Sequence, residues 1–195
     1  MKKLTMTAVA VLFCLTGAAR ADSSRRTTTI SSSSQQQKFW VGVDGDFALP
    51  IGNYSDVNGV GGSLLIVGEY PVMPELSATA RIGFQYHADK DLGAGINAHV
   101  HSIPVLLGAK YYLMSHGDRQ GLFGAFELGM FDLMTSASNG GVSASQNDIK
   151  FGTGVGVGYA MKEWNARVSL HSHDIGHFGD ALMVTAGVGY TFAGF

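Results

Sequence analysis

The sequence predicts an all-β fold, an eight-stranded antiparallel up-and-down transmembrane β-barrel, and three observations lead to that prediction. Eight segments alternate between apolar residues and small or polar ones, which is the period of a strand with two unlike faces. Aromatic residues gather at both ends of these segments, as in the interfacial girdles of membrane barrels. The last segment, 181–192, exceeds the about 10 residues that a tilted strand needs to cross a bilayer.

Residues 1–21 are expected to be a secretory signal peptide. A positively charged start precedes a mostly apolar stretch over 4–15, which is too short to span a bilayer as a helix. A small-x-small cleavage site ends at Ala21. Residues 22–37 are polar and of low complexity, so we expect a disordered periplasmic segment there, followed by the barrel over 38–195.

Removal of the signal peptide changes the charge and the chemistry of the chain. It takes away three of the 13 Lys and Arg residues and none of the 15 Asp and Glu residues, so the mature chain is acidic. That balance argues against a nucleic-acid partner. Cys14, the one cysteine, leaves with the peptide, which excludes a disulfide or a reactive thiolate. Motifs for nucleotides are absent, and we expect no cofactor.

The number of predicted strands is even, as it is in bacterial single-chain barrels with both termini on the periplasmic side. The third strand is among the clearest, with Ile82 and Phe84 on one face and Arg81 and Gln85 on the other. The predicted strands cover 38–48, 60–70, 75–87, 99–113, 121–134, 149–160, 164–173 and 181–192.

Three places depart from regular alternation. In the second strand Leu65 and Val67 fall on the polar face, and in the fifth Asp132 falls on the apolar face, which suggests a bulge near Asp132. Pro104 lies inside the fourth strand and removes one ladder hydrogen bond. A closed barrel has no edge strand to hold it, so we expect a local break or bulge there.

The connections alternate in length and indicate an orientation. Those at 71–74, 114–120 and 161–163 should be periplasmic turns, whereas 49–59, 88–97, 135–148 and the shorter 174–180 should face outward. The aromatic residues support this orientation. Those at the periplasmic ends are Phe39, Trp40, Tyr70, Tyr111, Tyr112, Tyr159, Trp164, Tyr190 and Phe192, and those towards the outer ends are Phe47, Phe84, Tyr86 and Phe131.

A soluble lipocalin-type barrel would turn its apolar face inward instead. Mid-strand ionisable residues on the Gly-rich face and the aromatic belts favour a lipid-facing apolar surface, with the charges inside. An eight-stranded interior is just wide enough to be filled by side chains, so charges in it must pair. We expect an ion-paired plug, with a narrow channel for small solutes as the alternative. Its members are Asp44, Asp46, Glu69 and Glu127 with Arg81, Lys110, Lys150 and Arg167.

Two stretches resemble known membrane barrels. Thr185, Gly187, Tyr190 and Phe192 resemble the C-terminal β-signal of bacterial outer-membrane proteins, which the insertion machinery reads. The run IPVLLGAKYY over 103–112 resembles a recurrent strand of the small OmpA-like and OmpX-like eight-stranded barrels.

This resemblance implies a place in the bacterial cell outer membrane after signal-peptide-directed secretion. The partners it implies are outer-membrane lipid and lipopolysaccharide, the barrel-insertion machinery and periplasmic chaperones. It also implies a structural or surface-interaction role, such as adhesion or envelope integrity, towards an external ligand that the sequence does not identify.

Some barrels of this size are lipid A-modifying enzymes, which is the third functional alternative. The deacylase uses a histidine and a serine two residues further on, so that both lie on one strand face. In His171-Ser172-His173 and His99-Val100-His101-Ser102 the histidines are two apart and each serine lies on the opposite face. We therefore expect no catalytic residues.

Six of the seven histidines fall at the predicted outer ends of strands or in the last external loop, and only His116 lies in a periplasmic turn. Residues two apart on a strand point the same way, so His99 with His101, and His171 with His173, are candidate metal-binding pairs. Histidine also suits a membrane rim, and the spacing is not that of a zinc site.

Overall fold

The computed structural model describes residues 38–195 except 94–95, 114–118 and 140–141. The predictions made for residues 1–21 and 22–37, and for His116, lie outside the described residues.

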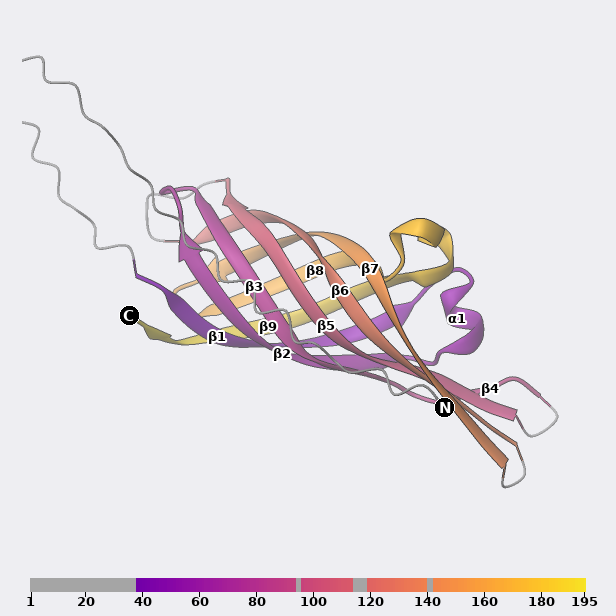
Figure 1. Cartoon of the computed structure of the whole chain (residues 1–195). Helices are drawn as coiled ribbons and strands as arrows, with labels where there is room; N and C mark the ends of the chain where they lie inside the picture. The colour runs from indigo at the N-terminus through magenta and orange to yellow at the C-terminus, as the bar shows by residue number, and fades with distance from the viewer. Residues whose placement is uncertain (1–37, 94–95, 114–118, 140–141) are drawn as a thin grey trace, which may run out of the picture. The chain divides into compact units, whose positions relative to one another are not determined.

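Eight long strands form one closed antiparallel barrel, which confirms the predicted fold class (Figure 1). Each strand pairs with its neighbours along the chain, and the barrel closes where the first strand pairs with the last. The strands are β1 (Trp40–Pro50), β2 (Gly61–Pro71), β3 (Leu76–His87), β5 (Ile96–Tyr112), β6 (Gly121–Asn139), β7 (Val142–Met161), β8 (Trp164–Ser172) and β9 (Leu182–Gly194).

Three short elements lie in the described connections at the end of the barrel away from the C-terminus (Figure 1). They are α1 (Tyr54–Val57), the two-residue strand β4 (Lys90–Asp91), which pairs with β5, and the 3-10 helix η1 (Ile175–Ala181). At the other end, the backbones of Phe39 and Phe195 exchange hydrogen bonds of 3.0 and 2.9 Å. No helix in the described part of the chain is long and apolar enough to cross a membrane.

Alternation of side chains about the barrel wall explains the irregular second strand. In β2, Leu64 and Ile66 are 66% and 58% exposed on the outer surface, whereas Leu65 and Val67 are buried inside. The strand is apolar on both faces because the interior at this position is filled by aliphatic side chains as well as by charges.

The bulge predicted near Asp132 is wrong. The pairing of β6 with both β5 and β7 runs through Asp132 without a shift in register. Phe131, expected in the outer aromatic girdle, points inward and is 2% exposed. The prediction failed because the inner face was taken to be polar along its whole length, and near the outer mouth it is aromatic.

Pro104 produces a break and no bulge. The ladder between β5 and β6 continues through the pair Pro104 and Phe131. On the other side, the ladder between β3 and β5 stops after Ile82 and Val105 and resumes at Gln85 and Ser102 in the same register. Loss of one N–H donor therefore interrupts the pairing with β3 only.

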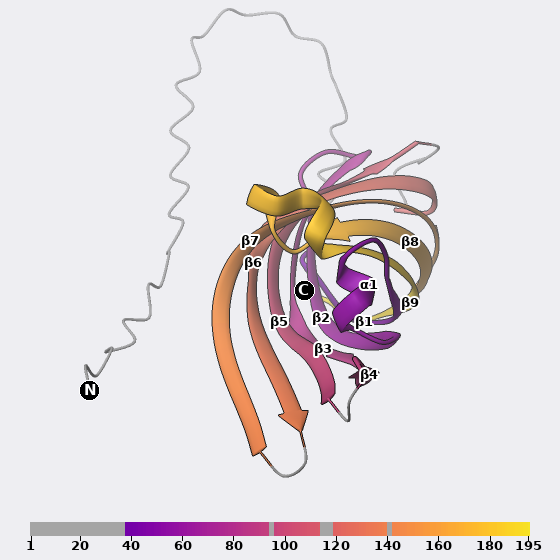
Figure 2. The same ribbon diagram turned by 90° about the vertical axis from the view of Figure 1, so that its right-hand side faces the viewer.

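The two longest strands, β6 and β7, project beyond the rest of the wall (Figures 1 and 2). Pairing of β7 with β8 begins at Thr153 and Ser172, so β7 from Val142 to Gly152 has no partner strand on that side among residues 38–195 as described. The segment 135–148, expected as a loop from its Gly, Asn and Ser content, is therefore mostly a hairpin. Its backbone joins the β5 ladder, which overrides the low strand propensity of these residues.

Aromatic side chains form the two expected belts with three exceptions. Phe47, Phe84 and Tyr86 are exposed near the outer end, and Tyr111, Tyr159, Trp164 and Phe192 are among those exposed near the other end. Tyr112 and Phe131 instead point inward and are each 2% exposed. Trp40 pairs with the buried Glu69 and lines the cavity inside the barrel.

We expect the substitution Ile66→Arg to destabilise the barrel in lipid vesicles by about 2–4 kcal/mol. Ile66 pairs with Ile82, which pairs with Val105, and these residues form a band between the two aromatic belts. A charge there would face the hydrocarbon core. The shift of the urea unfolding midpoint measures the effect. Thr135→Arg, on the exposed projecting part of β6, is the matched control and should leave the midpoint unchanged. Equal shifts in the two variants would contradict the lipid-facing orientation.

Candidate functional site

The centre of the barrel holds a buried network of charges from four strands. Arg81 on β3 places Nη2 3.0 Å from Oδ2 of both Asp44 and Asp46 on β1, and its Nη1 lies 3.2 Å from Oε2 of Glu127 on β6. Arg167 on β8 donates from Nη1 to Oε1 of Glu127 at 2.9 Å. All five residues are at most 8% exposed. Charges removed from water this completely persist only when they are paired and hydrogen-bonded.

The last strand leaves room for the acids of this network. Asp44 lies opposite Gly189 and Asp46 opposite Gly187 in the register between β1 and β9. A Cβ added at either glycine would collide with Oδ1 of the facing aspartate. The alternation of glycine along β9 therefore determines where the carboxylates sit, and Arg81 can reach both of them.

A second network lies nearer the chain termini and is centred on Glu69 of β2. The Glu69 carboxylate accepts hydrogen bonds from Lys110 Nζ at 3.0 Å, the Tyr112 hydroxyl at 2.9 Å and Arg119 Nε at 2.8 Å. Arg119 also stacks its guanidinium over the Trp40 ring at 4.8 Å. Burial lowers the pKa of Arg119, but the hydrogen bond and charge of Glu69 outweigh it, so the pKa lies above its ordinary value.

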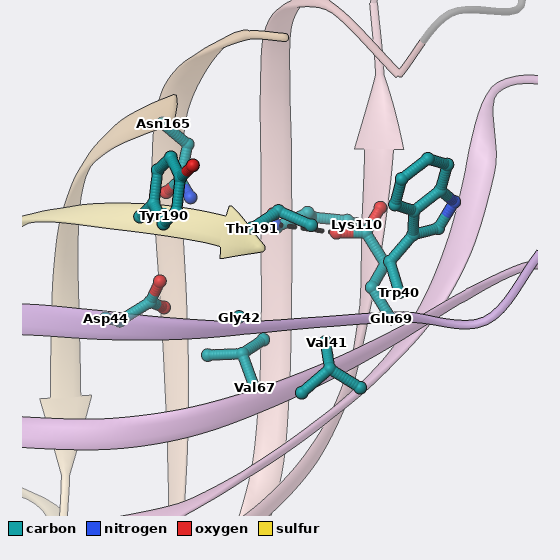
Figure 3. A pocket seen from close by; sticks show the side chains of 10 residues that line it. All are labelled: Trp40, Val41, Gly42, Asp44, Val67, Glu69, Lys110, Asn165, Tyr190 and Thr191. Carbon is teal, nitrogen blue, oxygen red and sulfur yellow. Dashed lines mark hydrogen bonds and ion pairs between the residues drawn. The ribbon is translucent and has the colours of Figure 1, made fainter. Parts of the chain in front are cut away.

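The two networks compensate each other in charge. The central one has three acids and two bases, and the second has one acid and two bases. Between them lies a cavity of about 10 Å³, lined by Asp44, Glu69, Lys110 and Asn165 among others (Figure 3). Figure 3 shows Lys110 reaching across to Glu69. A cavity of this size holds about one water molecule.

Seven of the eight residues predicted for the ion-pair network lie in these two clusters, and Lys150 does not. Lys150 has the right parity on β7 but lies beyond the point where β7 leaves the barrel wall. Its Nζ contacts Asp148 at 3.2 Å and Asp174 at 3.3 Å, and its side chain is 37% exposed. The fourth base of the two networks is Arg119, which sequence reasoning missed because it lies in a turn and not on a strand.

The glycines of β7 make room for large side chains from the neighbouring strands. A Cβ at Gly152 would collide with Phe131, and one at Gly154 would collide with His171. Both glycines face large side chains from the neighbouring strands at the outer half of the barrel. Close approach of an aromatic ring to the backbone explains glycine at these positions.

The histidines predicted at the outer rim fall into two groups. His87, His171 and His173 are 0%, 4% and 0% exposed, so they are interior residues and not rim residues. His99 and His101 lie nearer the surface and stack at 4.2 Å between ring centroids, with His99 Nδ1 2.6 Å from Asp89.

These positions do not bring the two candidate metal-binding pairs together. Within the described ranges, no group of three or more His, Cys, Asp or Glu side chains is arranged to hold a metal ion.

The four residues of the predicted insertion signal occupy both faces of β9. Thr185 and Gly187 point inward, and Tyr190 and Phe192 are exposed on the outer surface. The strand continues two residues past Phe192, where Ala193 and Gly194 still pair with β1. The signal is thus part of the strand that closes the barrel.

We expect Arg81→Met to destabilise the folded barrel by about 3–5 kcal/mol, because it leaves three buried carboxylates with one partner between them. The urea unfolding midpoint in detergent or lipid is the measurement. The additional change Asp46→Asn should recover part of the loss by removing one of those charges. Lys150→Met, which removes a surface partner, should leave the midpoint unchanged. A midpoint unaffected by Arg81→Met would contradict the buried network.

Comparison with known proteins identifies the fold. No protein-family model matches the chain, and no curated protein matches its sequence. Ail, the attachment invasion locus protein of Yersinia pestis, matches with a TM-score of 0.57 at 12% identity, over 80% of this chain and 99% of that one. The N-terminal β-barrel domain of Pseudomonas aeruginosa OprF matches with a TM-score of 0.52 at 16% identity, over 80% of this chain and 100% of that one. The chain has the fold of the small OmpA-like and OmpX-like outer-membrane barrels.

Proposed function

We propose that this protein lies in the bacterial outer membrane and serves there as a closed barrel that supports a projecting external sheet for surface interaction. The outer surface supports the membrane location, because large apolar side chains such as Leu64, Leu107 and Val157 are more than 60% exposed between the aromatic belts. Outer-membrane lipid and lipopolysaccharide are the partners that such a belt requires.

The lumen supports a closed barrel more than a channel. Two networks of charged side chains extend between strands on different sides of the interior, and their members are nearly fully buried. A channel that conducts ions needs wet, mobile charges, whereas these are paired in fixed geometry.

The observation that carries the interaction role is the free edge of β7. From Val142 to Gly152 the strand pairs, within the part of the chain that the structure describes, on its β6 side only. Between 142 and 149 this edge contains no proline or lysine, the residues that natural proteins use to block an edge; Lys150 follows at its inner end and pairs with Asp148 and Asp174. Such an edge accepts an extended segment of a partner protein by β-strand addition.

The charge of the external connections indicates which kind of partner could bind there. The segments 49–59, 88–97, 135–148 and 174–180 contain six aspartates and one lysine. Ail has been crystallised with the heparin analogue sucrose octasulfate, and that complex matches this chain with a TM-score of 0.56 at 12% identity. An acidic outer end repels a polyanion of that kind, so we propose a neutral or basic polypeptide as the partner.

Replacement of residues 136–145 by an Asn-Gly turn tests the interaction role. Ser136 pairs with Ser145, so this change shortens the hairpin in register and joins Thr135 to Gln146 through a two-residue turn. Cells that display the shortened protein should lose adhesion to immobilised protein matrices, while the barrel still migrates differently on gels before and after boiling. Unchanged adhesion with an intact barrel would contradict the proposal.

Conductance measurements distinguish a closed barrel from the alternative, a narrow channel for small solutes. The intact protein should give no single-channel steps in planar bilayers, because the central network blocks the lumen. Arg81→Ala combined with Arg167→Ala should produce steps by removing both cations that hold the three carboxylates. Regular steps from the intact protein would favour the channel.

No observation favours the third alternative, a lipid A-modifying enzyme. The Ser102 hydroxyl donates to Gln85, and the Ser172 hydroxyl contacts the carbonyl oxygens of Asp174 and Phe178. Neither hydroxyl is held by a histidine in these contacts, as a serine nucleophile requires.

We also propose that four residues of β9 act as the insertion signal: Thr185, Gly187, Tyr190 and Phe192. Their position in the strand that closes the barrel supports this. Tyr190 and Phe192 present aromatic rings on the outer surface of β9, where the insertion machinery has access to them.

A further inference from the structure

The short helices α1 and η1 lie at the outer mouth of the barrel (Figure 2), and Tyr54 of α1 is buried against Ala48 and Met183. Tyr54 is 5% exposed and packs edge-on against His173 at 5.2 Å and His87 at 5.6 Å between ring centroids. A side-chain hydrogen bond of 2.7 Å from Asn53 Nδ2 to Asp180 Oδ1 joins the connections that carry the two short helices. We call Tyr54 with α1 and η1 the outer cap.

His173 forms the floor against which the outer cap rests. Its ring is 0% exposed and stacks on Phe131 at 4.3 Å with 27° between the planes. Among the described residues, neither ring nitrogen of His173 has a hydrogen-bond partner, nor has the Tyr54 hydroxyl. Gly152 on β7 gives Phe131 the space to lie there. Burial without a hydrogen-bond partner disfavours the protonated form of this imidazole.

The groups around His173 offer no compensation for a positive charge. His171 on β8 and His87 on β3 act on it electrostatically, and both oppose its protonation. On β6, Glu127 is engaged by Arg81 and Arg167.

The carboxylates of the cap are engaged elsewhere too. On η1, Asp174 accepts the N–H groups of Gly176 and His177 and pairs with Lys150 of β7 at 3.3 Å. Asp180 accepts from Asn53. From α1, Tyr54 presents a neutral ring to His173, and Asp56 is exposed to solvent. Met183 of β9 contributes an uncharged side chain to the core beneath the cap.

We propose that the contact between Tyr54 and His173 is an acid-sensitive latch on the outer mouth. Protonated His173 leaves its aromatic pocket in acid, the outer cap moves away from the mouth, and solvent and external partners gain access to the outer half of the lumen. The latch is independent of the free edge of β7, so its failure would leave the proposed surface interaction intact.

Linkage gives the direction and size of the effect. Burial lowers the pKa of His173 to about 3 in the closed state, whereas an exposed histidine has an ordinary value of 6.5. The closed state is therefore fully favoured above pH 6.5 and loses its advantage as the pH falls from there towards 3. Relative to pH 8, the ratio of open to closed molecules rises about 10-fold at pH 5.5 and about 100-fold at pH 4.5.

A pair of spin labels reports the movement of the cap. Residues 22–195 contain no native cysteine, so Val57→Cys on α1 and Thr135→Cys on β6 place labels on the cap and on the wall alone. Both positions are exposed. Pulsed electron paramagnetic resonance on the mature chain refolded into lipid vesicles should show one narrow distance at pH 8. At pH 4.5 a displaced component should grow about 100-fold relative to the closed one.

His173→Phe identifies the switch. Phenylalanine keeps the stacking on Phe131 and the edge contact with Tyr54 but takes no proton, so this variant should stay closed at pH 4.5. His177→Gln is the matched control, because His177 is a histidine of the same cap with a side chain 72% exposed. It should open as the parent does.

Three results would overturn the latch. They are one distance distribution at both pH values, equal opening in His173→Phe and the parent, or loss of the folded gel band at pH 4.5, which would show that acid unfolds the whole barrel. If His173→Phe does not give the folded band, His173→Leu takes its place with the same expected result.

Discussion

The structure depends on one constraint, that charges inside an eight-stranded barrel have almost no water to solvate them. Arg81 replaces the missing water by pairing with three carboxylates from two strands at 3.0–3.2 Å. A planar guanidinium has enough donors in fixed directions to do this, and an ammonium has not. The glycines of β9 and the register of β1 follow from the same need, because they set the positions of Asp44 and Asp46.

The alternation of residues along the strands predicts most of the fold and much of the ion network. It gives no information on strand length or on residues in turns. Period two predicts which way a side chain points, so Asp44, Arg81 and Arg167 were correctly placed inside. It does not predict where the neighbouring strands end. Lys150 was misplaced because β8 ends at Ser172, opposite Thr153, so no described strand lies beside Lys150 on that side. Arg119 enters the lumen from a turn, where no period applies.

The outer half of the interior could not be read from the sequence for a different reason. The polar face was taken to be polar throughout, yet Phe131 and Tyr54 fill the lumen near the mouth. A membrane barrel has apolar surroundings outside, so an apolar residue inside gives no contrast along the strand. The distinction appears only when packing shows that His173 and Phe131 stack, which depends on residues 42 positions apart.

Closure of the wall between β1 and β9 has a consequence for the order of assembly. Every other strand pair joins segments that are close in the chain, but this seam joins its two ends, and Phe39 and Phe195 complete it. Until the seam forms, β1 and β9 both carry open edges with apolar outer faces. Asp44 and Asp46 stand on one side of the gap and the glycines that accommodate them on the other. The interior therefore reaches its final packing only when β9 pairs with β1 and the barrel closes. An assembly intermediate that lacks β9 has not formed the native interior.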